Sequence, residues 1–361
     1  MICCRNRGHL GKDLKWPHYE AIFKRVGLME TINQLTSIFL NHIEVEKISL
    51  RNLPNYIFFC GGGINGDDLS KINTSELGEF NSLRCAILHY LSSQEKELYQ
   101  DVILAEKFHD WLDDANINNL IDFEVLLAGL ATAVILIVEG PGAHAELGAF
   151  SVMPQISSKL ITIYNVNSIK NGQRTFIEWG PIKFLEKNEK IVLRHEWGVI
   201  YQLEDNAISQ LIDYNDDFKA LVNLIGTQLA KDIQGKSKKT AVFSRETPSD
   251  MCLLVADLVY VFSALKLREI KTYINEYLKI DLEEKILKEY LYSLKNLGLI
   301  KEKNAGAKYF LPTEKNKGFI KYQFKSSPDL PNNFSANYVK STLLSFYIKD
   351  DNERAYALGL R

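Results

Sequence analysis

One short segment, Val138-Glu-Gly-Pro-Gly-Ala-His-Ala-Glu-Leu-Gly-Ala-Phe150, holds the residue types most suited to chemistry. Pro141 favours a helix start, and Glu146 lies close enough to that start for the positive end of the helix dipole to favour its ionised form. A charged carboxylate beside a crevice can attack or stabilise the cationic anomeric carbon of a sugar. The alternative is that Glu139 and Glu146 only cap or solvate the helix start, where acidic residues are common.

Three other residues of this segment are candidates for substrate contact. Gly142 allows a ligand to approach the backbone closely. His144 lies two residues before Glu146, and Glu139 directly follows an apolar run. A histidine at a helix start is also often incidental, so His144 by itself does not define a site.

A glycine-rich stretch, Gly61-Gly62-Gly63-Ile64-Asn65-Gly66, follows a short apolar run and formally matches G-x-G-x-x-G. In the dinucleotide fold a helix opens directly after this motif, whereas residues 67–74 are rich in Asp, Asn, Ser and Thr and favour a loop. The sequence therefore argues against a hydride-transfer site. Gly61, Gly62 and Gly63 leave room for a ribose or a phosphate, with backbone amides as donors, or they form a plain tight turn.

Two more carboxylates are candidates for acid/base work. Glu106 directly follows a predicted strand, so it either serves a sugar hydroxyl at the rim of the sheet or is a solvated loop residue. Glu124 and Asp122 lie on a predicted helix, where their side chains reach a pocket or face water. No His and carboxylate residues fall at metal-ligand spacing, so the sequence predicts no metal site.

A parallel sheet is needed to bring these residues together. Short apolar runs predict strands, and the amphipathic runs between them predict helices. The predicted strands cover 56–60, 101–105, 133–138, 160–164 and 191–194, and the predicted helices cover 75–92, 118–131 and the residues from 143. This alternation predicts an α/β fold with a Rossmann-like or flavodoxin-like parallel sheet covered on both faces. Ligands of such sheets bind outside the carboxyl ends of the strands.

Residues outside the sheet are expected to be mainly helical. Apolar residues at helical spacing mark 17–45 and 206–233, and the basic stretch 234–240 is typical of a hinge. The residues from 327 onward show no clear period.

A winged helix-turn-helix is predicted near the C-terminus. Three short helices at 251–265, 268–278 and 281–297 precede two strand-like runs around a turn at 304–306. Asp281 is expected to cap the third helix, with Glu284 three residues later. The predicted division of the chain is an N-terminal helical segment (1–50), a sheet domain (51–200), a helical linker (201–245), a winged-helix domain (246–326) and a tail (327–361).

The net charge of −2 conceals a basic region. Residues 231–326 contain 19 Lys and Arg against 12 Asp and Glu, and residues 295–325 contain eight Lys against two Glu. Such a wing suits sequence-independent phosphate contacts. The helix at 281–297 carries three Glu beside two Lys in its first half, which does not favour reading of a DNA major groove. Packing on a protein, or contact of the wing with structured nucleic acid, is at least as consistent with these charges.

The cysteine content indicates a cytoplasmic protein, because five scattered cysteines without a C-x-x-C pair are typical of reduced thiols. The N-terminal residues show no signal peptide. The most apolar stretch, 126–138, is shorter than the roughly 18 residues that cross a bilayer. We therefore expect no contact with a membrane.

The chain resembles the retron-associated effector toxins, which combine a nucleoside 2-deoxyribosyltransferase-like domain with a C-terminal winged helix. The resemblance covers about residues 56–185 and extends more loosely through the winged helix. It rests on Phe59-Cys-Gly-Gly, on Glu139-Gly-Pro-Gly-Ala-His-Ala-Glu-Leu-Gly-Ala-Phe150 and on Trp179-Gly-Pro-Ile-Lys-Phe-Leu185. The second motif is the most specific of the three.

The resemblance implies that Glu146 is the nucleophile of an antiphage toxin that cleaves N-glycosidic bonds in NAD or another nucleotide. The nucleotide is then a substrate, and no cofactor is expected. The implied partners are a reverse transcriptase and its RNA-linked single-stranded DNA, which hold the toxin inactive in a homo- or hetero-oligomer. The longer loop at 61–75 and the added domains depart from the deoxyribosyltransferases and favour hydrolysis over transfer. The alternative function is a non-catalytic, nucleotide-sensing regulator that contacts nucleic acid.

Overall fold

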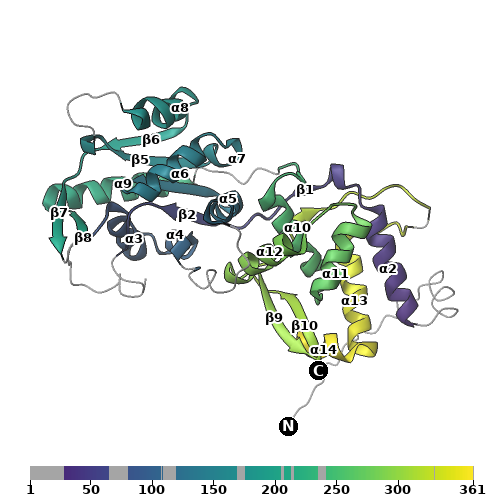
Figure 1. Ribbon diagram of the computed structural model, residues 1–361. Coiled ribbons are helices and arrows are strands. Elements are labelled where there is room, and N and C mark those ends of the chain that lie inside the picture. The colour runs from purple at the N-terminus through teal and green to yellow at the C-terminus, as the bar shows by residue number, and fades with distance from the viewer. Residues whose placement is uncertain are drawn as a thin grey trace, which may run out of the picture.

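Two bodies lie side by side in the described chain, a sheet body and a second body that is mainly helical (Figure 1). The computed structural model describes residues 28–64, 80–106, 108, 119–168, 175–204, 207–212, 215–234, 241–328 and 330–360. Most of the predicted loop after Gly63 therefore lies outside the described residues, as does the first part of the predicted helix at 75–92. No helix among the described residues is long and apolar enough to cross a bilayer.

The sheet body is built on five parallel strands in the order β3-β2-β4-β5-β6. Their bounds are β2 Ile57–Cys60, β3 Val102–Ile103, β4 Ala133–Val138, β5 Leu160–Asn165 and β6 Ile191–His195. The prediction of a parallel α/β sheet is confirmed. From β2 the chain first adds β3 on one side and then crosses to add β4 on the other side, as in doubly wound sheets of the flavodoxin type. The connections that leave β2 and β4 therefore diverge between these two strands.

Helices cover both faces of this sheet because alternate strand residues point to opposite sides. Ile57, Ile135 and Ile161 pack with helices α3 (Leu83–Gln94) and α9 (Asp216–Gln234). Phe58, Val134 and Leu136 pack on the other face, with α5 (Leu120–Leu130) and α6 (Pro141–Ser151). The short helices α4 (Lys96–Gln100), α7 (Pro154–Ser157) and α8 (Lys183–Lys187) and a π-helix at Glu178–Ile182 complete the body.

The predicted helix at 206–233 is wrong over its first part. The structure has a hairpin there, β7 (Val199–Glu204) and β8 (Ala207–Ile212), and α9 begins only at Asp216. The apolar spacing of Ile208, Leu211 and Ile212 fits a helix as well as a strand end. Pairing with β7 decides between them, because the backbone groups of both strands are satisfied in the ladder.

The second body contains the predicted three helices and hairpin. They are α10 (Pro248–Phe262), α11 (Leu267–Thr272, continued by a π-helix at Tyr273–Tyr277), α12 (Glu284–Asn296), β9 (Ile300–Ala305) and β10 (Ala307–Pro312). The hairpin turns at Gly306, which has a φ of 73°. Leu265, between α10 and α11, forms an antiparallel bridge with Phe310 of β10.

The predicted cap of the third helix is wrong. The N-cap of α12 is Glu283, which makes no side-chain cap bond, and Asp281 lies outside the helix. Ile280 and Leu282 are buried, and the Leu282 carbonyl accepts a hydrogen bond from Asn275. These contacts draw residues 280–282 into the core, so the helix cannot start at Asp281.

Two helices of the tail have no counterpart in the sequence prediction, α13 (Ala336–Asp350) and α14 (Asn352–Leu358). Ser335 caps α13 by accepting from the Tyr338 amide. Helix α2 (Leu28–His42), part of the predicted helical segment at 17–45, packs against α13 in the second body. Residues 17–27 lie outside the described residues.

The chain crosses between the bodies twice at one place. Strand β1 (Ser49–Leu50) pairs with β11 (Ile320–Lys321) of the second body before the chain enters the sheet body. On the way back, the Ala241 carbonyl accepts from the Leu50 amide at 2.8 Å, and Val242 forms a bridge with Ser49. The sheet body is therefore inserted into the second body through two adjacent tethers.

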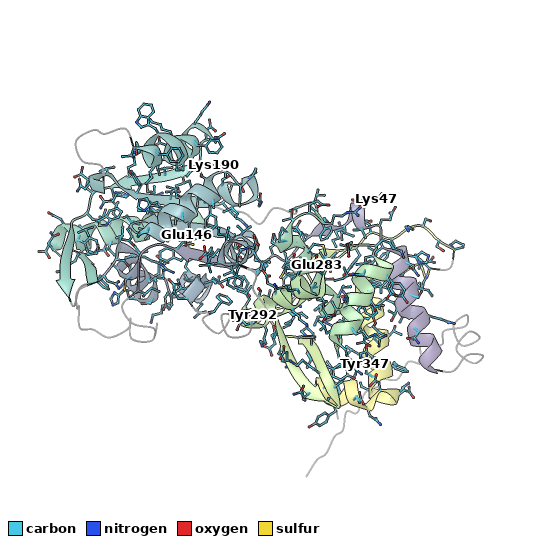
Figure 2. The ribbon with its side chains drawn as sticks, viewed as in Figure 1. Lys47, Glu146, Lys190, Glu283, Tyr292 and Tyr347 are labelled. Atoms are coloured by element: carbon cyan, nitrogen blue, oxygen red, sulfur yellow. The ribbon has the colours of Figure 1, made fainter. Side chains whose placement is uncertain are left out.

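The joint between the bodies is packed rather than open. Helix α5 packs on α10, and one apolar cluster runs continuously from the sheet face into the second body. The Tyr56 hydroxyl donates to the Leu297 carbonyl at 2.7 Å, and the Tyr292 hydroxyl donates to the Phe108 carbonyl at 3.5 Å. Tyr292 lies at this joint in Figure 2. Residues 289–294 of α12 are all buried, so that half of the helix has no free face.

Candidate active site

The carboxyl ends of β2 and β4 are joined by Glu139, the first residue after β4. Its Oε1 accepts hydrogen bonds from the amides of Gly62 (3.2 Å) and Arg84 (3.0 Å), and its Oε2 accepts from the Leu83 amide (2.9 Å). Amides at a helix N-terminus lack partners within the helix. Glu139 therefore caps α3. The alternative drawn from the sequence was that Glu139 caps or solvates the start of α6, the helix that follows it. Substrate binding by Glu139 stays a prediction.

Close packing explains why residue 62 is a glycine. A β-carbon on Gly62 would lie 2.9 Å from Glu139 Cγ and 2.9 Å from Ser82 Cβ. Ser82 is the N-cap of α3, where its hydroxyl accepts from the Cys85 amide at 2.9 Å and donates to the Gly63 carbonyl at 2.5 Å. The glycine stretch is thus held against the start of α3 and the end of β4.

Arg84 is a site residue that the sequence analysis missed. Its guanidinium is buried and forms a bidentate ion pair with Glu106, with Nη1–Oε1 at 2.5 Å and Nη2–Oε2 at 2.9 Å. It also donates to the carbonyls of Phe59 (2.8 Å) and Gly62 (3.2 Å). An arginine in the first turn of a helix, within an apolar run, was the available signal, because such a position opposes the helix dipole and buries a charge.

Glu106 lies on the predicted rim of the sheet, directly after β3 and Leu104–Ala105. Its ion pair with Arg84 joins the ends of β3 and β2. Burial lowers the pKa of Arg84, but the hydrogen bond and charge of Glu106 outweigh burial and raise it. Glu106 is therefore a paired, half-exposed carboxylate rather than a freely solvated loop residue.

Glu146 and Glu124 are the carboxylates without such stabilisation. Glu146 lies on α6 in the sheet body (Figure 2), and its Oε2 is buried and accepts no hydrogen bond from the described residues. Burial, and then the negative charge of Glu124, raise the pKa of Glu146 to about 7. Burial, and then the charge of Glu106, raise the pKa of Glu124 to about 7. The two carboxyl groups are thus electrostatically coupled.

The expected ionisation of Glu146 by the helix end is wrong. Glu146 is the sixth residue of α6, beyond the first turn in which the dipole acts. Removal of the carboxylate from water is the dominant effect, and it favours the protonated form.

The charges of these groups all act on one buried thiol. Cys60, the last residue of β2, is fully buried, and burial raises its pKa well above the usual value. The charges that act on this thiol come from Glu146, Arg84, Glu124 and Glu106. The structure therefore brings together the three predicted catalytic residues and Arg84 at the end of β2.

The remaining predicted residues of the segment lie at the start of α6. The Nδ1 atom of His144 is 2.6 Å from the Gly140 carbonyl, so its ring is bound to its own helix start. Gly142 is exposed, and a β-carbon there would meet no atom of the described residues within 4 Å. Asp122 is exposed and hydrogen-bonded to Asn119 at the start of α5. Substrate contacts of Gly142 and His144 stay predictions.

The chemistry available here is that of paired carboxylates. Two carboxyl groups with pKa values near neutrality can divide one proton, so that one acts as nucleophile or base and the other as acid. Arg84 supplies the positive charge that limits their mutual repulsion. The described residues hold no group of three or more His, Cys, Asp or Glu placed to bind a metal ion.

Fold and site together define a class: a doubly wound α/β protein with a carboxylate cluster where the strand order reverses. The family of STM3845 retron effector proteins matches residues 81–302, which is more than half of the chain. The protein belongs to this retron effector family, as the sequence resemblance indicated. The matched region contains Arg84, Glu106, Glu124, Glu139 and Glu146 and runs into the first strand of the hairpin β9–β10.

Two curated relatives come from retrons of Escherichia coli. The retron Ec73 protein is 25% identical over 335 residues, which cover 90% of this chain and 94% of the relative. The retron Ec86 protein is 29% identical over 159 residues, which cover 44% of this chain and 46% of the relative. The names of both relatives propose a ribosyltransferase and DNA-binding protein.

Proposed function

We propose that this retron effector is an antiphage toxin that hydrolyses N-glycosidic bonds in NAD or another nucleotide, with Glu146 as the nucleophile. The observation that carries the proposal is the buried Oε2 of Glu146, which lacks a hydrogen bond from the described residues and whose pKa lies at about 7. A structural glutamate at this depth would be hydrogen-bonded, as Glu139 is. The ribosyltransferase names of the relatives support the same reaction class.

In the proposed reaction the Glu146 carboxylate attacks the anomeric carbon of the sugar. The C–N bond breaks, and its electron pair leaves with the base; a cationic nicotinamide ring then needs no proton, whereas other bases take one. Water next attacks the glycosyl ester, its proton passes to a carboxylate such as Glu124, and Glu146 is regenerated. For a neutral nucleoside the base takes its proton from a protonated carboxyl such as Glu124, and the net reaction consumes one water and yields the free base and a sugar hydroxyl; with NAD one proton is released as well.

The other residues of the cluster position these groups. The Arg84–Glu106 pair holds the ends of β2 and β3 and, in the proposal, directs Glu106 toward a ribose hydroxyl. The turn at Gly61–Gly63 is pinned by Ser82 and Glu139, and in the proposal the nucleotide lies over it.

The proposed partners are a reverse transcriptase and its RNA-linked DNA, which hold the toxin inactive. In this proposal residues 51–200 form the catalytic domain and residues 246–326 a winged helix. The Leu265–Phe310 bridge, which ties the segment before α11 to the hairpin β9–β10, supports the winged helix, whereas α9 packs on the sheet and extends the catalytic domain to Gln234. Because residues 289–294 of α12 are buried, contact through the wing or through protein is favoured over insertion of α12 into a DNA groove.

The test is incubation of the purified chain with NAD and a panel of nucleotides and deoxynucleotides, followed by mass spectrometry. We expect release of a free base by the wild type and a loss of at least about a hundredfold in Glu146→Gln, since the amide keeps the volume but is no nucleophile. Glu97→Gln, on the exposed side of α4, is the matched control. Base release that persists in Glu146→Gln would show that Glu146 is not the nucleophile. Nucleotide binding without base release would favour the alternative function, a non-catalytic regulator.

A further inference from the structure

A groove on the outer side of α6 gathers most of the exposed aromatic residues of the described chain. Its volume is about 460 Å³, and it is lined by α6, by the π-helix and by α8. Phe176 is 86% exposed, Trp179 55% and Phe184 46%, and in the described residues only Tyr356 is another aromatic side chain exposed to this degree. Large apolar side chains that cluster at a surface mark an interaction site more often than a chance arrangement.

The shape of the groove leaves the aromatic rings accessible. Gly148 of α6 forms part of the lining, and a β-carbon there would meet no described atom within 4 Å. The Phe176 ring lies over Gly180, where a β-carbon would be 3.5 Å from the ring. Flat rings beside small residues form a platform on which another flat ring can stack.

The charges around the groove favour an anionic occupant. The charged residues of its lining are Lys183 and Lys187, and the Lys183 ammonium lies 5.7 Å from the centre of the Trp179 ring. The nearby carboxylates of Glu178 and Glu186 are bound by Arg194 of strand β6, at 2.7 Å and 2.8 Å, and Glu186 Oε2 also lies 3.8 Å from the Lys183 ammonium. Lysines that flank exposed aromatic rings are the arrangement by which proteins hold unpaired nucleotides.

We propose that this groove binds single-stranded nucleic acid, with bases stacked on Phe176, Trp179 and Phe184 and phosphates paired with Lys183 and Lys187. The site is separate from the hairpin β9–β10, and it does not depend on the proposed hydrolysis of nucleotides. Glu146 lies two residues before Gly148 on the same helix, so a strand in the groove would rest on the outer side of the helix that carries the candidate nucleophile.

The experiment measures binding of a fluorescein-labelled oligonucleotide of about 20 unpaired thymidines to the full chain by fluorescence anisotropy. Trp179→Ala and Phe184→Ala should each weaken binding about 5- to 150-fold, the range for loss of one base–aromatic stack, and Trp179→Phe should restore most of the affinity. Lys187→Ala should lower the dependence of binding on salt. Leu224→Ala and Lys231→Ala, exposed residues of α9, are the matched controls and should bind as the wild type does.

Location is read by photocrosslinking of a strand that contains 5-iodouracil, with crosslinks expected at Trp179 or Phe176. Crosslinks confined to β9–β10, unchanged affinity of both alanine variants, or equal binding of a perfect duplex would each overturn the proposal. A groove variant that dissociates an oligomer but keeps its strand affinity would also overturn it, and would assign the groove to protein contact. Glu146→Gln should bind the oligonucleotide as the wild type does. Failure of the proposed hydrolysis and failure of the proposed strand binding are therefore distinguishable.

Discussion

Four glutamates end up near the carboxyl edge of one sheet, and their surroundings give them different roles. Glu139 accepts three backbone hydrogen bonds, and Glu106 is paired with Arg84. Burial raises the pKa of Glu146 and that of Glu124 to about 7, against the opposing charge of Arg84. Identical side chains thus form a helix cap, one half of an ion pair and two buried carboxyl groups with raised pKa values.

The coupling between Glu146 and Glu124 predicts an unusual pH dependence of base release. The nucleophile must be ionised, so kcat/KM should fall below a midpoint near pH 7 rather than near the usual value of 4.5. Glu124→Gln removes a negative neighbour, which lowers the pKa of Glu146 and moves the acidic midpoint to lower pH. Rate profiles of wild type and variant measure this shift, and an unmoved midpoint would show that the two groups are not coupled.

The same carboxyl groups predict how stability changes with pH. Their pKa is raised in the folded chain, so each binds its proton more tightly when folded. Their contribution to stability is complete below about pH 4.5 and is lost as the pH rises through about 7. The free energy of unfolding of Glu124→Gln, relative to that of the wild type, should therefore be about 1 to 3 kcal/mol higher at pH 8.5 than at pH 5. Urea unfolding at both pH values tests this, and an equal difference at both would contradict it.

At the scale of elements, the start of α3 depends on a side chain from another strand. Glu139→Ala leaves the amides of Gly62, Leu83 and Arg84 without their acceptor. We expect a loss of about 2 to 4 kcal/mol in the free energy of unfolding. Denaturant unfolding measures it, and Glu97→Ala on α4 should stay within about 0.5 kcal/mol of the wild type. A loss of that small size in Glu139→Ala would show that water replaces the carboxylate.

Elements whose signal is local could be predicted from the sequence. Strand β4 is a continuous apolar run, β5 is a mainly apolar run that contains Thr162, and α5 has its capping Asn119 directly before it. Helix α13 was missed because its buried residues Ala336, Val339, Leu343 and Tyr347 form only a narrow stripe. Strand β8 was missed because its partner β7, not its own spacing, makes it a strand.

The candidate site was only partly predictable for the same reason. Glu146 and Glu106 could be placed because each lies near the end of an apolar run, on the edge where ligands bind. The pKa of Glu146 could not, since it depends on burial and on Glu124 from another helix. Arg84 was missed because its partner Glu106 is 22 residues away and lies after a different strand.

At the scale of the whole molecule, the packed joint predicts that the two bodies unfold together. The apolar cluster is shared by α5 and α10, and the Tyr56 hydroxyl bonds across the joint to Leu297. Scanning calorimetry should show one transition, and Tyr56→Phe should lower the free energy of unfolding by about 1 kcal/mol without splitting it. Two resolved transitions in the wild type would show that the bodies are independent.

The paired crossing of the chain at Ser49–Leu50 and Ala241–Val242 restricts how the bodies can move. A single linker would allow rotation in every direction, whereas two tethers bound to each other leave mainly bending about one axis through that point. Bending about that axis would have to separate α5 from α10, so the packed joint opposes it. A cut in one tether would leave the halves attached through the other, so a nicked chain should migrate intact in native gels.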